Sequence, residues 1–248
     1  MNGLTVLLTL QRFRDAAFSL VAGTGFHSFG RGSRILLPFR VRNAQNIKIG
    51  SGVLIGASSW LIVPDASDSA PRIVIVPGWR DSGPGHWQSL WEARVPNAVR
   101  VAQDDWVTPS RDAWVGALTR LVLASDEPVV IAAHSLGCIA TMHLPPEAAD
   151  RIIGALLVAP ADPERRAVLS SFAPVPYAAL PYRSVVVASS NDPFCPVRLA
   201  GAYARAWGSE FVRIQNAGHI NVDSGHGEWP LGLALLQSLI PVETLATT

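Results

Sequence analysis

A serine stands between an apolar run and a helix-like stretch in the segment VVIAAHSLGCIATMHL, residues 129–144. A serine nucleophile projects from a sharp strand-to-helix turn, so that its oxygen is exposed while backbone N–H groups face the charge that develops during reaction. Small residues two positions before and after it let strand and helix pass closely, and here they are Ala133 and Gly137. A helix N-cap is the other interpretation of Ser135. Its position after a buried strand in the middle of the chain favours a nucleophile.

A serine nucleophile needs a base, and the base needs an acid that orients it. In hydrolases built from alternating strands and helices, the chain order is serine, acid, histidine. Asp162 and Asp192 both follow apolar runs, and either could instead cap a turn. We favour Asp192, because the acid usually lies one strand later than Asp162 does. For the base we favour His219, which follows the last apolar run and a glycine. The alternative, His226, lies deeper in a glycine-rich loop, where it would be solvated or form a hydrogen bond within the loop.

The other histidines receive no catalytic role. His134 precedes the serine directly, and we expect it to point away from the nucleophile and to be structural. No pair of potential ligands has the spacing of a zinc site, so we expect no metal. Triad chemistry also requires no cofactor.

In the second part of the chain, apolar strand-like runs alternate with helix-like stretches. Such alternation predicts an α/β fold whose parallel sheet is covered by helices on both faces. Right-handed crossovers then bring the carboxyl ends of all strands to one edge, where Ser135, Asp192 and His219 would meet. The predicted strands lie in 72–79, 98–102, 128–135, 153–162, 184–192 and 211–218, and the predicted helices at 86–94, 111–124, 136–144, 196–207 and 230–239.

Six motifs, in the order IVIVPGWRDSGPGHWQSLWE, QDDW, AHSLG, LLVAPAD, SSNDPFC and GHINVDSGHGEWP, resemble the small serine hydrolases related to retinoblastoma-binding protein nine. The resemblance covers about residues 71–240. It implies a compact α/β-hydrolase fold, a triad of Ser135, Asp192 and His219, and esterase-like or aminopeptidase-like activity on small substrates. Retinoblastoma binding depends on the pattern Leu-x-Cys-x-Glu. The nearest match, residues 136–140, ends in alanine, so we do not expect that function.

The same fold predicts an oxyanion hole made of two backbone N–H groups. One belongs to Leu136, directly after the nucleophile. The other comes from the loop PGWRDSGPGHW, where we favour Trp79, with Gly78 letting the backbone turn close to the substrate.

We expect the substrate pocket to be small. His86 and Trp87 open the helix after that loop and could wall the pocket, although a helix cap and a core position explain them equally well. The connection at 162–183, where larger relatives insert a lid, is short, and its Phe172 and Tyr177 are expected to wall an acyl pocket.

The first part of the chain has a different pattern. In IKIGSGVLIGASSWLIV, residues 47–63, Ile49-Gly50 and Ile55-Gly56 repeat at a spacing of six, and Leu61 lies one further step along. With the residues before it, from about 12, this resembles the start of a hexapeptide-repeat acyltransferase, a left-handed β-helix. We expect only about one coil, which could not bury its apolar side alone. Those residues must contact the hydrolase, pair with another chain, or stay exposed.

The predicted organisation is a leader at 1–64, a linker at 65–70, a serine hydrolase domain at 71–241 and a tail at 242–248. The linker lies in the stretch VPDASDSAPR, which is small, polar and contains two prolines. Association between chains through the leader is one of the three alternatives for its apolar residues.

Charge and composition exclude several partners. The net charge is +1, which gives no electrostatic basis for binding nucleic acid or a membrane surface. No apolar run reaches the roughly 18 residues of a membrane span. The opening residues lack a signal-peptide pattern, and the presence of only two cysteines suits a reducing cytoplasm. A single lysine among 20 basic residues suggests a GC-rich bacterial genome.

Three functions therefore remain. The sequence favours a serine hydrolase that cleaves small ester or amide substrates through an acyl-enzyme on Ser135. A non-catalytic binding module on a hydrolase scaffold is the alternative, because a fold alone does not establish activity. A truncated hexapeptide-repeat acyltransferase is the third, and it is disfavoured because no histidine occurs between His27 and His86.

Overall fold

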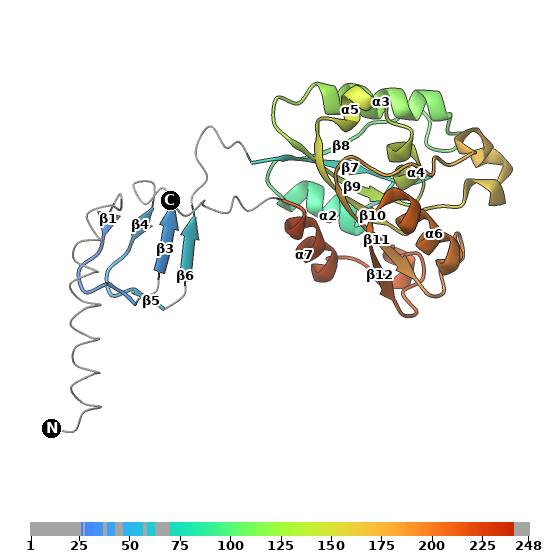
Figure 1. Cartoon of the computed structure of the whole chain (residues 1–248). Coiled ribbons are helices and arrows are strands. Elements are labelled where there is room, and N and C mark those ends of the chain that lie inside the picture. The colour runs from blue at the N-terminus through green and yellow to red at the C-terminus, as the bar shows by residue number, and fades with distance from the viewer. Residues whose placement is uncertain are drawn as a thin grey trace. The chain divides into compact units, whose positions relative to one another are not determined.

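A computed structural model describes residue 26 and residues 28–36, 39–42, 47–56, 59–62 and 70–240, with only the backbone described at 39–42 and 59–62. The chain divides into two units between Ser69 and Ala70 (Figure 1). The predicted linker, apart from Ala70, and the predicted tail at 242–248 lie outside the described residues.

The larger unit is built on a six-stranded sheet whose neighbouring strands are all parallel. The predicted strands and their parallel arrangement are confirmed. Because the chain runs outward from β7 first to β8 and then to β9 on the other side, the strand order switches direction between β7 and β9, which is where ligands bind in such sheets. In spatial order the strands are β12 (Glu210–Ile214), β11 (Arg183–Ser189), β10 (Ile152–Val158), β9 (Val129–His134), β7 (Arg72–Val76) and β8 (Ala98–Arg100).

Helices cover both faces of this sheet, as predicted (Figure 1). One apolar core joins the sheet to α3 (Arg111–Leu123), α4 (Leu136–Met142) and α6 (Val197–Trp207). A second core, on the opposite face, joins it to α2 (Trp87–Arg94) and α7 (Pro230–Ser238).

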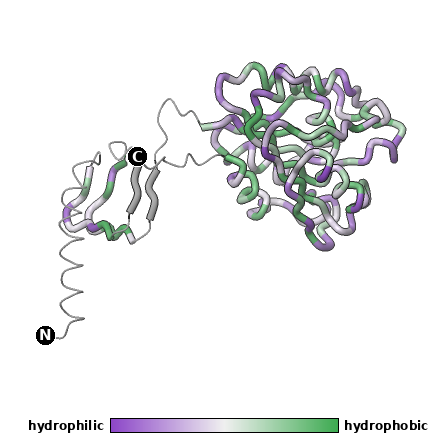
Figure 2. The backbone as a smooth tube through the Cα atoms, viewed as in Figure 1, coloured by the Kyte–Doolittle hydropathy of each residue, from purple (hydrophilic) through white to green (hydrophobic). Residues whose placement is uncertain are grey.

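The strand side chains alternate between these two cores. In β9, Val129, Ile131 and Ala133 belong to the first core, and Val130 and Ala132 belong to the second. All five are fully buried, and hydrophobic segments run through the interior of the unit (Figure 2). A strand buried on both faces must be apolar at every position, which explains the continuous apolar runs in the sequence.

Four short helices were not predicted from the sequence. The structure adds α5 (Pro146–Ala149) and the 3₁₀ helices η3 (Pro163–Arg165), η4 (Ala167–Phe172) and η5 (Val222–Ser224). Each is too short to show an apolar periodicity. Within the part of the chain that the structure describes, no helix is long and apolar enough to cross a membrane.

The described residues of the smaller unit form three short parallel pairs: β1 (Ser28–Phe29) with β4 (Lys48–Ile49), β2 (Arg34–Ile35) with β5 (Leu54–Ile55), and β3 (Phe39–Arg42) with β6 (Ser59–Ile62). In each pair the partners lie 20 residues apart, as in Ser28 opposite Lys48. Two successive turns of chain therefore stack on each other, and the expectation of about one coil is wrong.

Stacking gives this unit a small core of its own. Phe26, Ile35 and Ile55 are buried, with Ile49 packed against them. A Cβ atom at Gly30 would lie 2.3 Å from the backbone of Gly50, so glycine allows the two turns to approach there. The spacing of six in the sequence marked the second turn, but the first turn lacks the regular aliphatic-glycine pairs and was not recognised. The side chain of Leu61 lies outside the described residues, and association through the leader stays a prediction.

Candidate active site

Ser135 occupies the turn between β9 and α4. Its backbone has φ 53° and ψ −119°, a conformation that residues other than glycine rarely adopt. A Cβ atom at Gly137 would lie 2.3 Å from the carbonyl oxygen of Val76, so only glycine lets α4 pass β7 at this distance. The sharp turn expected around the serine is present, with the small residue where the packing requires one.

A continuous chain of hydrogen bonds joins the serine to a carboxylate. The Oγ atom of Ser135 lies 2.9 Å from Nε2 of His219. On the other side of the ring, Nδ1 of His219 lies 2.9 Å and 3.0 Å from the two carboxylate oxygens of Asp192. The Asp192 side chain is 3% exposed, and His219 and Ser135 are each 8% exposed. The three residues predicted from the sequence are therefore brought together at one edge of the sheet.

The loops after β11 and β12 are connected by hydrogen bonds that hold the acid and the histidine opposite each other. The backbone N–H of Ala217 donates to Oγ of Ser189 at 3.0 Å, and that of Gly218 donates to the side-chain oxygen of Asn191 at 2.8 Å. Sequence reasoning missed both positioning residues. Their signal was the run of polar residues SSND directly after a buried strand.

The alternative acid and base are not part of this chain of hydrogen bonds. A carboxylate oxygen of Asp162 accepts the N–H of Glu164 and caps η3, although Asp162 lines the same pocket. His226 lies within hydrogen-bond distance of Ser224 in its own loop. Both match the structural interpretations given to them.

His134 lines the pocket and packs against the loop that carries His219. Its ring lies 4.8 Å from the ring of His219, and its Nε2 donates to the backbone oxygen of His219 at 2.9 Å. Burial lowers the pKa of His134 well below its ordinary value, so the ring is neutral and acts as a donor only through Nε2. This contact was not predicted, because a residue at the end of a strand faces a neighbouring loop that the sequence does not reveal.

Two backbone N–H groups are available next to the serine. In the described part of the chain, no backbone or side-chain acceptor takes the N–H of Leu136 or of Trp79. Gly78 brings the Trp79 loop close, since a Cβ atom at this position would lie 2.7 Å from Cβ of Ser135. The Trp79 ring is fixed by a hydrogen bond from Nε1 to the Val107 oxygen at 2.8 Å.

A pocket of about 630 Å³ opens over Ser135 and His219. Of the predicted lining residues, Gly78 and His86 do line it. His86 also caps α2, because its Nδ1 accepts the N–H of Gln88. The structure therefore supports the pocket and the cap interpretations of His86 together.

The other three predicted lining residues lie elsewhere. Trp87 is fully buried and packs on Trp229 in the core under α2. Phe172 is fully buried against Trp114 in the opposite core, and Tyr177 is 57% exposed. An aromatic residue that is predicted to line a pocket can equally well belong to the apolar core, and only the observed packing distinguishes these two positions.

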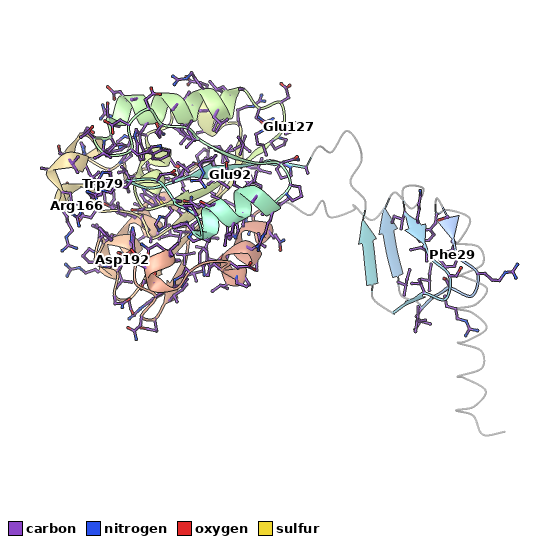
Figure 3. The ribbon with its side chains drawn as sticks, turned by 180° about the vertical axis from the view of Figure 1, so that it is seen from behind. Phe29, Trp79, Glu92, Glu127, Arg166 and Asp192 are labelled. Atoms are coloured by element: carbon purple, nitrogen blue, oxygen red, sulfur yellow. The ribbon has the colours of Figure 1, made fainter. Side chains whose placement is uncertain are left out.

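The pocket instead uses residues that the sequence did not single out. The ring of Phe194 lies 4.4 Å from that of His219, and Leu169 adds a second apolar wall. Arg166 and Trp79 lie at the same end of the unit as Asp192, opposite Glu127 (Figure 3). In the described ranges, no group of three or more His, Cys, Asp or Glu side chains is arranged to hold a metal ion.

The parallel sheet, the turn at Ser135 and its switch-point position define an α/β-hydrolase. The chain belongs to the serine hydrolase family, whose model matches residues 73–238. A YdeN-like hydrolase of Pectobacterium atrosepticum is 37% identical, with a TM-score of 0.62 over 68% of this chain and 92% of that one.

More distant structures share the fold alone. The ydeN gene product of Bacillus subtilis is 22% identical, with a TM-score of 0.58 over 68% of this chain and 98% of that one. Esterase 2 of Thermogutta terrifontis, phosphorylated by paraoxon, is 16% identical, with a TM-score of 0.55 over 74% and 87%. A comparison with curated proteins found no match.

Proposed function

We propose that this chain hydrolyses small esters or amides through an acyl-enzyme on Ser135. The observation that carries the proposal is the unbroken chain of hydrogen bonds from Ser135 through His219 to Asp192. Family membership supports the reaction class. The proposed steps use side chains of this chain, two backbone N–H groups and water.

In the first half of the reaction, Oγ of Ser135 attacks the substrate carbonyl carbon while Nε2 of His219 takes the hydroxyl proton. The carbonyl oxygen becomes an oxyanion that accepts from the N–H groups of Leu136 and Trp79. When the tetrahedral intermediate collapses, the bond to the leaving group breaks and His219 gives that group its proton. The acyl group remains on Ser135 as an ester.

Water completes the cycle by the same path. His219 takes a proton from a water molecule, whose oxygen attacks the acyl carbon. Collapse of the second intermediate returns the proton to Oγ of Ser135 and releases the acid. Throughout, Asp192 keeps the proton of His219 on Nδ1, so that Nε2 can accept, and it stabilises the imidazolium that forms.

Labelling with a fluorophosphonate probe, followed by peptide mapping, tests the proposal. We expect the label on Ser135, and the Ser135→Ala variant should lose about 10⁴-fold or more in kcat while keeping its fold. Absence of labelling would instead favour a binding module. Hydrolysis that survives in Ser135→Ala would place the nucleophile elsewhere.

We propose further that hydrolysis resides in residues 71–241 and that the chain belongs to the branch related to retinoblastoma-binding protein nine. The motifs AHSLG, SSNDPFC and GHINVDSG support the second point.

A cytoplasmic location is proposed because Cys138 and Cys195 are both free and buried, a state that a reducing compartment maintains.

A further inference from the structure

Three arginines line the pocket over Ser135: Arg80, Arg165 and Arg166. In the part of the chain that the structure describes, none of them forms an ion pair with a carboxylate. Arg165 donates only to a backbone oxygen, that of Pro193 at 3.4 Å. Guanidinium groups beside a reactive serine, without an acidic partner, are available to a ligand.

Two of these arginines are held by aromatic rings. The guanidinium carbon of Arg80 lies 4.4 Å from the centre of the Trp79 ring, and that of Arg166 lies 5.5 Å from the same ring. Arg166 also lies 5.0 Å from the ring centre of Phe194. Because the Trp79 ring is itself fixed by its hydrogen bond to Val107, the stacking restrains both charges next to the proposed oxyanion donor.

The pocket also contains carboxylates, and their charges must be counted. Asp81 is bound by Arg100 at 2.8 Å. Asp162 and Asp223 remain without an ion pair in the described ranges. Among the residues that line the pocket, three arginines without an ion pair therefore lie with two such carboxylates, an excess of one positive charge, while the Asp192 carboxylate lies behind His219 and does not line the pocket. That balance suits a singly charged carboxylate better than a doubly charged phosphate.

A buried donor in the same pocket has no acceptor. Among the residues that the structure describes, Nε2 of His86 has no hydrogen-bond partner, and His86 is only 5% exposed. Since its Nδ1 accepts from Gln88, the proton is on Nε2. Burial lowers the pKa of His86 to about 4, which keeps the ring neutral and Nε2 a donor at neutral pH. A buried donor without a partner is costly, so an oxygen acceptor that reaches it would be stabilising.

We propose that substrates of this pocket carry one carboxylate group besides the bond to be cleaved, and that Arg80 and Arg166 bind it. The inference rests on the proposed hydrolase function and adds the substrate class. The role of the two arginines is specificity: they hold the anionic end of the substrate while the Trp79 N–H faces the reacting carbonyl.

Matched ester pairs test this. Monomethyl adipate and methyl hexanoate have the same acyl chain and differ in a terminal carboxylate, and 4-carboxyphenyl acetate and phenyl acetate place the same difference on the alcohol. We expect kcat/KM to favour the charged ester about tenfold or more in at least one pair. Arg166→Gln and Arg80→Gln should each reduce that preference several-fold, and the double variant should abolish it.

Arg213→Gln is the matched control, because Arg213 is an exposed arginine on β12 without an ion pair in the described residues and outside this pocket. It should leave the preference unchanged. Equal or better turnover of the neutral ester in both pairs would overturn the proposal. So would a charged-ester preference that survives in the double arginine variant.

Binding to Ser135→Ala separates this inference from the proposed reaction. By calorimetry, that variant should bind the charged ester of the preferred pair about tenfold more tightly than the neutral one, and addition of Arg80→Gln and Arg166→Gln should remove the difference. If wild-type protein hydrolyses no ester but this binding difference is present, the proposed reaction fails and the carboxylate preference stands. Equal binding of the charged and neutral esters would contradict the proposed carboxylate preference, even if hydrolysis is observed.

Discussion

The backbone at Ser135 lies in a left-handed conformation that costs free energy for any residue with a side chain. Its surroundings hold it there, because its N–H donates to Val158 at 2.9 Å and its carbonyl accepts from Cys138 and Ala161. The helix α4 begins at the next residue, so Oγ projects toward His219 instead of capping the helix. At the scale of the residue, strain and hydrogen bonding together position the proposed nucleophile.

The choice between two aspartates is a prediction at this scale. Asp192→Asn should lower kcat on the order of 10³-fold or more, because an amide cannot hold the Nδ1 proton of His219 as a carboxylate does. Asp162→Asn, which alters only the cap of η3 and the pocket wall, should lower it by less than about tenfold. Steady-state kinetics on the same ester measures both.

The two variants control each other, since both exchange a carboxylate near Ser135 for an amide of equal size. Circular dichroism should show both folded. Comparable losses in the two variants would mean that Asp192 has no privileged role.

Buried His86 makes stability depend on pH. In the folded chain its pKa is lowered from 6.5 to about 4, first by burial and then by Arg100. Between these values the unfolded chain binds a proton that the folded chain does not, so the free energy of unfolding decreases as the pH falls from about 6.5 toward 4. The contribution of His86 reaches about 3 kcal/mol at the lower end.

Urea unfolding at pH 7 and pH 5 measures this effect. The His86→Asn variant keeps an acceptor for the helix cap but does not titrate, so it should lose less stability between the two pH values than wild type. Buried His134 acts in the same direction, which leaves part of the slope in place. An identical slope in variant and wild type would assign the pH dependence to other groups.

At the scale of elements, the connection between β10 and β11 decides how much substrate is covered. It contains only η3 and η4, and η4 turns Leu169 toward the pocket while burying Phe172 in the core. A larger insertion at this position would form a lid. Without one, the pocket of about 630 Å³ is walled by Trp79, Leu169 and Phe194.

We therefore expect short acyl chains to be preferred. In a series of 4-nitrophenyl esters, kcat/KM should be highest for acyl groups of a few carbons and should fall as the chain outgrows the apolar walls, since further methylenes remain in water. The wild-type rate at each chain length is the measurement. A maximum at twelve carbons or more would show that a further apolar surface binds the chain.

At the scale of the whole molecule, the proposed site lies entirely in the larger unit. The first strand of its sheet, β7, begins at Arg72, and Ser135, Asp192, His219 and the proposed oxyanion donors all follow it. The smaller unit has its own core around Ile35. Among the described residues, each unit has an apolar core of its own, which is the condition for folding separately.

A chain beginning at Ala70 should therefore fold and keep most of the wild-type kcat/KM. Circular dichroism and fluorophosphonate labelling of the truncated protein, beside the full chain, measure the two parts of this prediction. An unfolded truncated protein would mean that earlier residues complete the hydrolase core. A folded but inactive protein would mean that they contribute to the pocket.

The sequence by itself determined the parallel sheet, its helices and the three residues Ser135, Asp192 and His219. These follow from local rules, because strands buried on both faces are continuously apolar and their carboxyl ends share one edge. Chain order left two acids and two histidines as candidates, and their positions after the later strands favoured Asp192 and His219.

Only the tertiary structure decided which side chains surround that chain of hydrogen bonds. Trp87 and Phe172 belong to cores and Arg166 stacks on Trp79 in the pocket, because the direction of a side chain depends on what packs against it from distant parts of the chain. The first turn of the smaller unit was not recognised for a related reason, since pairing across 20 residues tolerates irregular repeats. Spacing along the chain predicts position on an element, whereas contacts between elements decide the lining of a pocket.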